Sequence, residues 1–219
     1  IGIGGSATND GGAGMLAALG WRFLDSDGNE LPPVGASLER IASIDSSEKN
    51  PVLDGCTFIT ACDVDNPLCG PDGAAFVFAP QKGAGPDQVL LLDKGLESFA
   101  SVIQESTGTN VKDIPGAGAA GGLGGALLAF LGAKLTPGAE MVLEAIGFDA
   151  KAEGADLVIT GEGRMDFQTL KGKAPLCVLR HAAKLGIPTV ALAGIISDID
   201  LLKGLGYKDI LCINPPGLP

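Results

Sequence analysis

The last third of the chain alternates apolar runs with stretches of helical character, and this alternation constrains the fold most. The runs at 156–160, 188–193 and 209–213 predict strands, whereas 168–185 and 198–204 predict helices. Apolar strands that are separated by helices are typical of a parallel sheet covered by helices. The sequence therefore predicts an α/β fold.

The chain before Gly154 mixes predicted strands and helices with two glycine-rich loops. A composition change at Ala152-Glu153-Gly154 predicts a domain boundary near residue 153, which separates a domain at 1–153 from one at 154–219. The predicted elements of the first domain are a hairpin at 21–32, strands at 56–62 and 74–78, and helices at 12–19, from Pro86 to about Ile103, from 125 to about 133, and at 138–145.

The first glycine-rich loop, residues 3–13, carries side chains suited to a ligand. Its glycines let backbone N–H groups approach an anion, and its hydroxyls could add donors. Asp10 could hold a metal ion or orient a substrate hydroxyl. The alternative is a tight turn from a strand into a helix, with Asn9 or Asp10 as the N-cap. The candidate ligand-binding residues here are Gly4, Gly5, Ser6, Thr8 and Asn9.

The second glycine-rich loop, residues 115–125, formally matches the dinucleotide fingerprint G-x-G-x-x-G. The preceding segment 111–114 is short and half charged, so the buried strand that the fingerprint requires is missing. A helix N-terminus that offers N–H groups to a phosphate or carboxylate explains the loop better. Close helix packing enabled by glycine is the alternative. The candidate residues are Gly116, Gly118, Gly121 and Gly122.

Two acidic clusters follow predicted strands, where α/β proteins bind ligands. Asp63 and Asp65 favour metal chelation or a raised pKa on one carboxyl, with an Asx-turn before Pro67 as the alternative.

The second acidic cluster, residues 161–166, is predicted to form a loop after the strand at 156–160. Arg164 and Lys173 could grip an anion there, and Glu162 or Asp166 could hold a metal ion. A salt-bridged loop is the alternative.

The net charge, the cysteines and the single histidine limit the partners and the reactions that this chain could have. A net charge of −11 disfavours nucleic acids and anionic membranes as partners. Five cysteines without a C-x-x-C pair indicate reduced thiols and a cytoplasmic location. The single histidine, His181, is expected on the surface near a helix C-terminus, so proton transfer falls to carboxylates or lysines. Such a residue set suits phosphoryl transfer.

Five long motifs make the chain resemble the bacterial glycerate kinase family. They are GIGGSATNDGGAGM at 2–15, CDVDNPLCGPDGA at 62–74, F-x-PQKGA at 78–84, PGAGAAGGLGGAL at 115–127 and DLVITGEGRMDFQTLKGKAP at 156–175. The resemblance implies an ATP- and Mg²⁺-dependent kinase that phosphorylates the 2-hydroxyl of D-glycerate. It also implies two α/β domains with the active site in the cleft between them. Residues 1–153 are then mostly an inserted domain, and 154–219 part of a Rossmann-like parallel-sheet domain.

Roles within that resemblance follow from chemistry. We predict that Asp63 accepts the hydroxyl proton, that Asp10 or Asp166 binds Mg²⁺, and that Arg164 and Lys173 neutralise charge on the transferred group. The two glycine-rich loops and Glu162 are predicted to hold phosphate or substrate.

Family chains begin with a further segment that carries an APDSFK-like motif, and they continue past Pro219. The sheet of this chain is therefore expected to have an unpaired edge and an exposed apolar face near 156–160 and 189–193. A homo-oligomer is one option. Two other functions remain open, namely a nicotinamide-dependent hydroxyacid oxidoreductase and a non-catalytic module that binds a nucleotide or a sugar acid.

Overall fold

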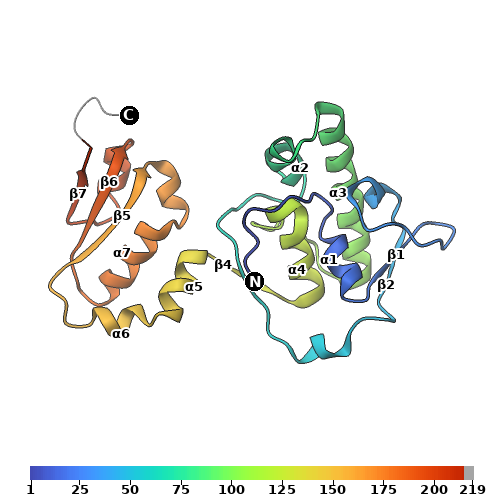
Figure 1. The fold of residues 1–219 in the computed structure, drawn as a ribbon, viewed down its shortest axis with the longest axis horizontal. Coiled ribbons are helices and arrows are strands. Elements are labelled where there is room, and N and C mark those ends of the chain that lie inside the picture. The colour runs from blue at the N-terminus through green and yellow to red at the C-terminus, as the bar shows by residue number, and fades with distance from the viewer. Residues whose placement is uncertain (215–219) are drawn as a thin grey trace. The chain divides into compact units, whose positions relative to one another are not determined.

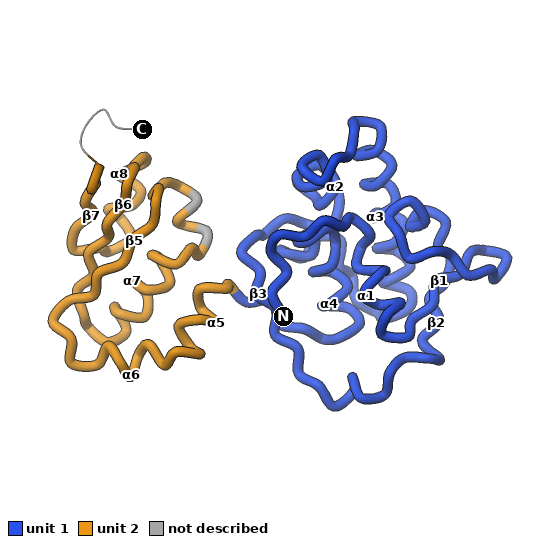
Figure 2. The backbone as a smooth tube through the Cα atoms, in the orientation of Figure 1, with its two compact units in different colours: residues 1–136 blue, residues 137–219 orange. Residues whose placement is uncertain are grey.

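The computed structural model describes residues 1–214, without the side chains of Gln168 and Lys171. The chain forms two compact units, residues 1–136 and 137–219 (Figure 2). This division precedes the predicted boundary near 153, because the helices at 138–152 pack within the second unit. The assignment of the two parts to an inserted and a Rossmann-like domain stays a prediction. Among the described residues, no helix is long and apolar enough to span a membrane.

Unit 1 is built around one long helix, α3 (Pro86–Thr107). Pro86 occupies the first turn, where a missing N–H costs nothing, and Gly108 ends the helix at φ 75°. Leu96, Phe99 and Ile103 on one side of α3 are buried in the core of the unit. The other elements, drawn in Figure 1, are α1 (Ala13–Ala18), β1 (Arg22–Leu24), η1 (Gly35–Arg40), β2 (Ser43–Asp45), η2 (Pro51–Gly55), β3 (Ile59–Ala61), α2 (Ala74–Phe78), η3 (Pro80–Lys82), η4 (Ala119–Gly122), α4 (Leu123–Leu131) and β4 (Lys134–Thr136).

A short parallel pairing brings the start of the chain beside the middle of unit 1. β3 pairs in parallel with β4, and Gly2 forms a parallel bridge to Ala61 of β3. The backbone N–H of Ala61 donates to the carbonyl oxygen of Ile1 at 2.7 Å. The first glycine-rich loop therefore begins next to the end of β3.

One local prediction for unit 1 is wrong, and another is confirmed with an additional strand. Residues 74–78 form the helix α2 and no strand, since a short apolar run does not distinguish a strand from a buried helix. In the hairpin predicted at 21–32, the turn forms, and the Asp25 carboxylate accepts the N–H of Asn29 at 2.8 Å. The two arms of the hairpin also pair, since Leu24 forms an antiparallel bridge to Glu30 and the N–H of Leu31 donates to the carbonyl oxygen of Phe23 at 2.8 Å. In addition, β1 pairs with β2 in an antiparallel ladder, which the sequence did not predict.

Unit 2 contains the predicted parallel sheet, in the order β5-β6-β7. Val158 pairs with Thr189, and Val190 pairs with Asp209. The helix α7 packs against β5 and β6. The elements of unit 2 are α5 (Gly138–Ala145), α6 (Phe148–Ala152), β5 (Val158–Met165), η5 (Phe167–Lys171), α7 (Ala174–Lys184), β6 (Thr189–Ile196), α8 (Ile199–Lys203) and β7 (Asp209–Cys212). The parallel sheets and their helices confirm the mixed α/β class.

The expected sheet edge is confirmed for β5 and wrong for β6. Among the described strands, β5 lies at an edge, whereas β6 pairs on both sides. The exposed large apolar side chains within the three strands are Ile159 of β5, which is 62% exposed, Leu211 of the other edge strand, at 45%, and Ile195 of β6, at 40% and beyond the predicted range 189–193.

Candidate functional site

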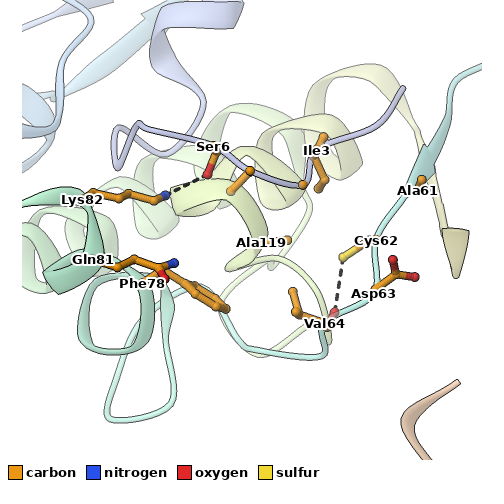
Figure 3. A pocket seen from close by; sticks show the side chains of 13 residues that line it. Ile3, Ser6, Ala61, Cys62, Asp63, Val64, Phe78, Gln81, Lys82 and Ala119 are labelled. Carbon is orange, nitrogen blue, oxygen red and sulfur yellow. Dashed lines mark hydrogen bonds between the residues drawn. The ribbon is translucent and has the colours of Figure 1, made fainter. Parts of the chain in front are cut away.

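A pocket in unit 1 brings together four segments that lie far apart in the sequence. Its volume is about 210 Å³. In Figure 3, Lys82 reaches Ser6 on one side, and the sulfur of Cys62 lies on the other. The lining residues are Ile3, Gly4, Gly5 and Ser6 from the first loop, Ala61, Cys62, Asp63 and Val64 at the end of β3, Phe78, Gln81 and Lys82, and Ala119 and Ala120.

The two glycine-rich loops pack directly against each other. The N–H of Gly11 donates to the carbonyl oxygen of Gly121 at 2.9 Å. Gly121 has φ 71°, and a Cβ there would lie 2.1 Å from the carbonyl oxygen of Thr8. A Cβ on Gly118 would lie 2.1 Å from the carbonyl oxygen of Pro67. Glycine is required here because the backbones approach too closely for any side chain.

This packing separates the predicted binding glycines into two groups. Gly4 and Gly5 line the pocket, and a Cβ added to either would meet no other part of the protein within 4 Å. The glycines of the second loop instead meet neighbouring backbone or side chains, as the packing alternative predicts. That loop contributes Ala119 and Ala120 to the pocket wall. Ala120 adopts φ 56°, a left-handed conformation that costs a residue with a Cβ about 1–2 kcal/mol.

The carboxylate of Asp10 caps the start of α1. Its two oxygens accept the N–H groups of Gly12 at 3.0 Å and of Gly14 at 3.1 Å. The N-cap residue of α1 is Gly12 and neither Asn9 nor Asp10, but the Asp10 carboxylate accepts N–H groups at the start of the helix. The neighbouring Asn9 has both polar side-chain atoms buried without a hydrogen-bond partner among the described residues. The metal role of Asp10 stays a prediction.

Lys82 is the cation of this pocket, and the reasoning from sequence did not select it as a site residue. Its ammonium donates to Ser6 Oγ at 2.8 Å and to the carbonyl oxygen of Thr8 at 2.6 Å. Burial lowers the pKa of Lys82, against the nearby charge of Asp10, which raises it. The available signal was its place in the motif at 78–84, between a predicted strand and a long helix.

Asp63 lies at the end of β3, as predicted, and its neighbour Cys62 faces the pocket interior. Figure 3 shows the Asp63 carboxylate on the opposite side of the backbone from the Cys62 sulfur. The thiol of Cys62 donates to the carbonyl oxygen of Val64 at 3.3 Å, and burial raises its pKa. Asp63 and Asp65 are both exposed.

The predicted charged cluster of unit 2 forms a connected polar network. Thr169 donates to Glu162 Oε1 at 2.6 Å, and Lys173 Nζ lies 3.7 Å from Glu162 Oε2. Arg164 Nε lies 3.2 Å from Asp166 Oδ2. Glu162 and Arg164 lie within β5, so the prediction that they belong to a loop after the strand is wrong. These contacts are the ones that the alternative interpretation, a segment held by salt bridges, predicts.

His181 is not on the surface, contrary to the expectation. Its side chain is buried on α7, with Nδ1 2.5 Å from Asp149 Oδ1 and Nε2 2.9 Å from Glu140 Oε1. The ring also contacts Phe148 edge-on at a centroid distance of 6.0 Å. The hydrogen bond with Asp149 raises the pKa of His181 most, and Glu140 raises it further. The imidazole therefore connects α5, α6 and α7.

A preformed metal centre is absent from the part of the chain that the structure describes, where no three His, Cys, Asp or Glu residues could hold one ion. This does not disfavour Mg²⁺, because a nucleotide-bound Mg²⁺ takes one or two carboxylates together with phosphates and water. The exposed carboxylates of Asp63 and Asp65 fit that pattern. Asp166 already lies beside Arg164, and its metal role stays a prediction.

Comparison with known proteins places this chain among glycerate kinases. A family model described as the glycerate kinase family matches residues 1–217. The chain belongs to the glycerate kinase family. A glycerate kinase from Bacillus subtilis is 48% identical over 220 residues, covering 100% of this chain and 58% of that protein. A glycerate 2-kinase from Escherichia coli is 49% identical over 198 residues, covering 90% of this chain and 52% of that protein.

A solved structure supports the same family. A crystal structure assigned as glycerate kinase 2 from Salmonella typhimurium matches with a TM-score of 0.80 at 46% identity. The match covers 97% of this chain and 55% of that one. The family member described here thus spans about half the length of the curated relatives and of the structure it matches.

Proposed function

We propose that the protein containing this chain transfers the γ-phosphoryl group of ATP to the 2-hydroxyl of D-glycerate, giving 2-phosphoglycerate. The observation that carries the proposal is the pocket in unit 1. Four of the five motifs that resemble glycerate kinases contribute residues to it, namely Ile3 to Ser6, Cys62 to Val64, Phe78 with Gln81 and Lys82, and Ala119 with Ala120. Family membership supports the kinase reaction, and the relative named glycerate 2-kinase supports the 2-position.

In the proposed reaction, the substrate hydroxyl oxygen forms a bond to the γ-phosphorus as the bond from that phosphorus to the bridging oxygen breaks. ADP leaves with the bridging oxygen, and Asp63 accepts the hydroxyl proton. This assignment is supported by the place of Asp63 after β3 among the residues that line the pocket, although its carboxylate lies on the opposite side of the backbone from the Cys62 sulfur (Figure 3). Mg²⁺ would neutralise phosphate charge when bound, with Asp10 or Asp166 as its proposed ligands.

The remaining roles are likewise proposals. Arg164 and Lys173 would neutralise charge on the transferred phosphoryl group, and Glu162, which contacts Lys173, would orient that lysine or the substrate. The pocket wall at Gly4, Gly5 and Ser6 would hold the substrate. A cytoplasmic location is proposed because the sequence has five cysteines and no C-x-x-C pair, which suits a reducing compartment.

Phosphorus NMR of the products tests the proposal on the full-length protein supplied with D-glycerate and MgATP. We expect the 2-phosphoglycerate resonance to grow as ATP is consumed. The absence of any phosphoglycerate would contradict the kinase function, whereas the 3-isomer would contradict only the position of attack. A nicotinamide fluorescence titration and a coupled assay of ADP release separate the kinase from an oxidoreductase and from a non-catalytic binding module.

A further inference from the structure

Lys82 differs from other lysines of unit 1 in what surrounds its charge. Lys49, Lys94 and Lys112 each lie beside a carboxylate, whereas Lys134, which has no carboxylate partner among the described residues, is exposed to water. Among the described residues, no carboxylate lies within 4 Å of Lys82 Nζ, although the chain carries 26 acidic side chains. Its neighbours are neutral oxygens, from the Ser6 hydroxyl and the Thr8 backbone.

The ammonium is held in place and partly removed from water. It has three N–H donors, of which Ser6 and Thr8 accept two, so one remains for a ligand in the pocket. The side chain is half-buried. Burial disfavours the charged ammonium more than the charge of Asp10, which lies beyond 4 Å, favours it, and an anionic ligand would offset the remaining cost.

The size and lining of the pocket indicate a small ligand. Its volume of about 210 Å³ is below the range of roughly 300–1,000 Å³ that is typical for drug-sized ligands. The walls away from Lys82 include Ile3, Val64, Phe78 and Ala119, which are apolar. A pocket with one cation at one end and apolar walls suits a short acid whose carboxylate meets the cation.

We infer that Lys82 binds the carboxylate of the hydroxyacid substrate and thereby selects an acid over a neutral polyol. This inference rests on the proposed function for the identity of the acid. Lys82 acts in binding, so it contributes equally to the ground state and the transition state, and its loss raises KM more than it lowers kcat. Ser6 and the Thr8 carbonyl hold the ammonium toward the ligand.

The test replaces Lys82 in the full-length protein by Met, which removes the charge and keeps the length of the side chain. We expect the KM for D-glycerate to rise about 10- to 100-fold, as for loss of a charge-assisted hydrogen bond. The KM for ATP should stay unchanged. The inhibition constant of glyceramide, the neutral amide of the same acid, should also stay unchanged, so that discrimination between acid and amide is lost.

Three further variants complete the design. Lys82→Arg keeps the charge and is expected to restore most of the affinity for D-glycerate. Lys112→Met removes a lysine of the same unit that pairs with Glu97 at 2.6 Å, and it should leave every constant unchanged. Lys82→Gln serves if the Met variant does not fold, which circular dichroism establishes.

Each result decides the inference. An unchanged KM for D-glycerate in a folded variant would overturn it, and so would equal losses for acid and amide, which indicate a structural role. A rise confined to the KM for ATP would place a phosphate at Lys82 and overturn it too. If the wild-type protein phosphorylates no glycerate, the proposed function fails by itself. Calorimetry of D-glycerate binding then decides: Lys82-dependent binding supports the inference, and equal or absent binding overturns it.

Discussion

The pocket of unit 1 and the polar network of unit 2 differ in whether their cations are paired with carboxylates. In unit 2, Arg164 lies beside Asp166 and Lys173 beside Glu162, so each cation faces an anion from its own unit. In unit 1, the described contacts of the Lys82 ammonium are with a hydroxyl and a carbonyl oxygen. A paired cluster is stable without a ligand, whereas a half-buried cation among neutral oxygens is stabilised by one.

Within unit 1, the two glycine-rich loops also differ in what their glycines contact. Gly4 and Gly5 border open space in the pocket, but Gly118 and Gly121 are pressed against backbone. Both loops look alike in the sequence, because both are rich in glycine before a helix. Glycine content thus identifies a close approach of the backbone, and the structure decides whether the neighbour is a ligand or another loop.

The largest expected effect tests whether Asp63 is a catalytic residue of the pocket or only part of a turn. Asp63→Asn keeps the size of the side chain but removes the proton acceptor, so kcat of the full-length protein should fall by about 10²- to 10⁴-fold. The KM for D-glycerate should change little, since ground-state binding is mostly preserved. Steady-state kinetics measures both constants.

Asp65→Asn is the matched comparison for this variant, because both carboxylates are exposed in the same segment after β3 and both fit a Mg²⁺ site, so a role as base predicts a loss of kcat for Asp63→Asn that raised Mg²⁺ does not reverse. A loss that shrinks when Mg²⁺ is raised would assign Asp63 to the metal ion. Wild-type kcat in a stable, folded Asp63→Asn protein would end the catalytic assignment.

The next effect concerns the contact between the two glycine-rich loops. Gly121→Ala places a Cβ against the Thr8 carbonyl oxygen in a left-handed backbone, so the free energy of unfolding of unit 1 should fall by about 2–4 kcal/mol. Trp21, the single tryptophan, is buried in this unit, so its fluorescence during urea unfolding reports on unit 1.

Gly132→Ala provides the comparison, since Gly132 has φ 58° and open space around its Cα. It should cost only about 1–2 kcal/mol, from backbone strain alone. Equal losses in the two variants would show that the close approach of the loops contributes nothing beyond that strain.

A smaller effect is expected from the buried histidine of unit 2. Asp149 and Glu140 raise the pKa of His181 in the folded state above its unfolded value. The stabilisation is therefore complete below the unfolded pKa of about 6.5, and it is lost as the pH rises through the higher folded pKa. His181→Gln should lose about 1–2 kcal/mol at pH 6 and less above the folded pKa.

His181 is the single histidine, so its ring proton resonances give the folded pKa directly in an NMR titration. Asp149→Asn should lower that pKa and flatten the dependence of unfolding on pH. A titration midpoint at or below 6.5 in the wild-type protein would contradict this account.

The sequence predicted regular elements well where long or repeated patterns existed. The predicted start of α3 at Pro86 and bounds of α5 are confirmed, as is the parallel sheet of unit 2. The prediction failed at Ala74–Phe78, where five apolar residues carry too little periodicity. It also failed at His181, because the buried imidazole contacts Asp149 and Glu140, which lie far away in the chain.

For the candidate site, the sequence predicted the segments better than the contacts. It selected the first loop and the end of β3, and both line the pocket. It did not select Lys82, because a lysine in a turn ordinarily lies in solvent, and only the contact with Ser6 shows otherwise. That contact joins residues 76 positions apart, which no local pattern encodes.

The smallest expected change in stability tests the paired network of unit 2. The side chain of Arg164 is 61% exposed, and exposed ion pairs contribute about 0–1 kcal/mol. Arg164→Met should therefore change the free energy of unfolding by no more than about 1 kcal/mol, measured by urea denaturation. If Arg164 also neutralises charge on the transferred phosphoryl group, kcat should fall in a variant that remains as stable as the wild type. An unchanged kcat would indicate that Arg164 only forms its salt bridge. That cation of unit 2 would then be structural, in contrast to the ligand-binding cation proposed for the pocket of unit 1.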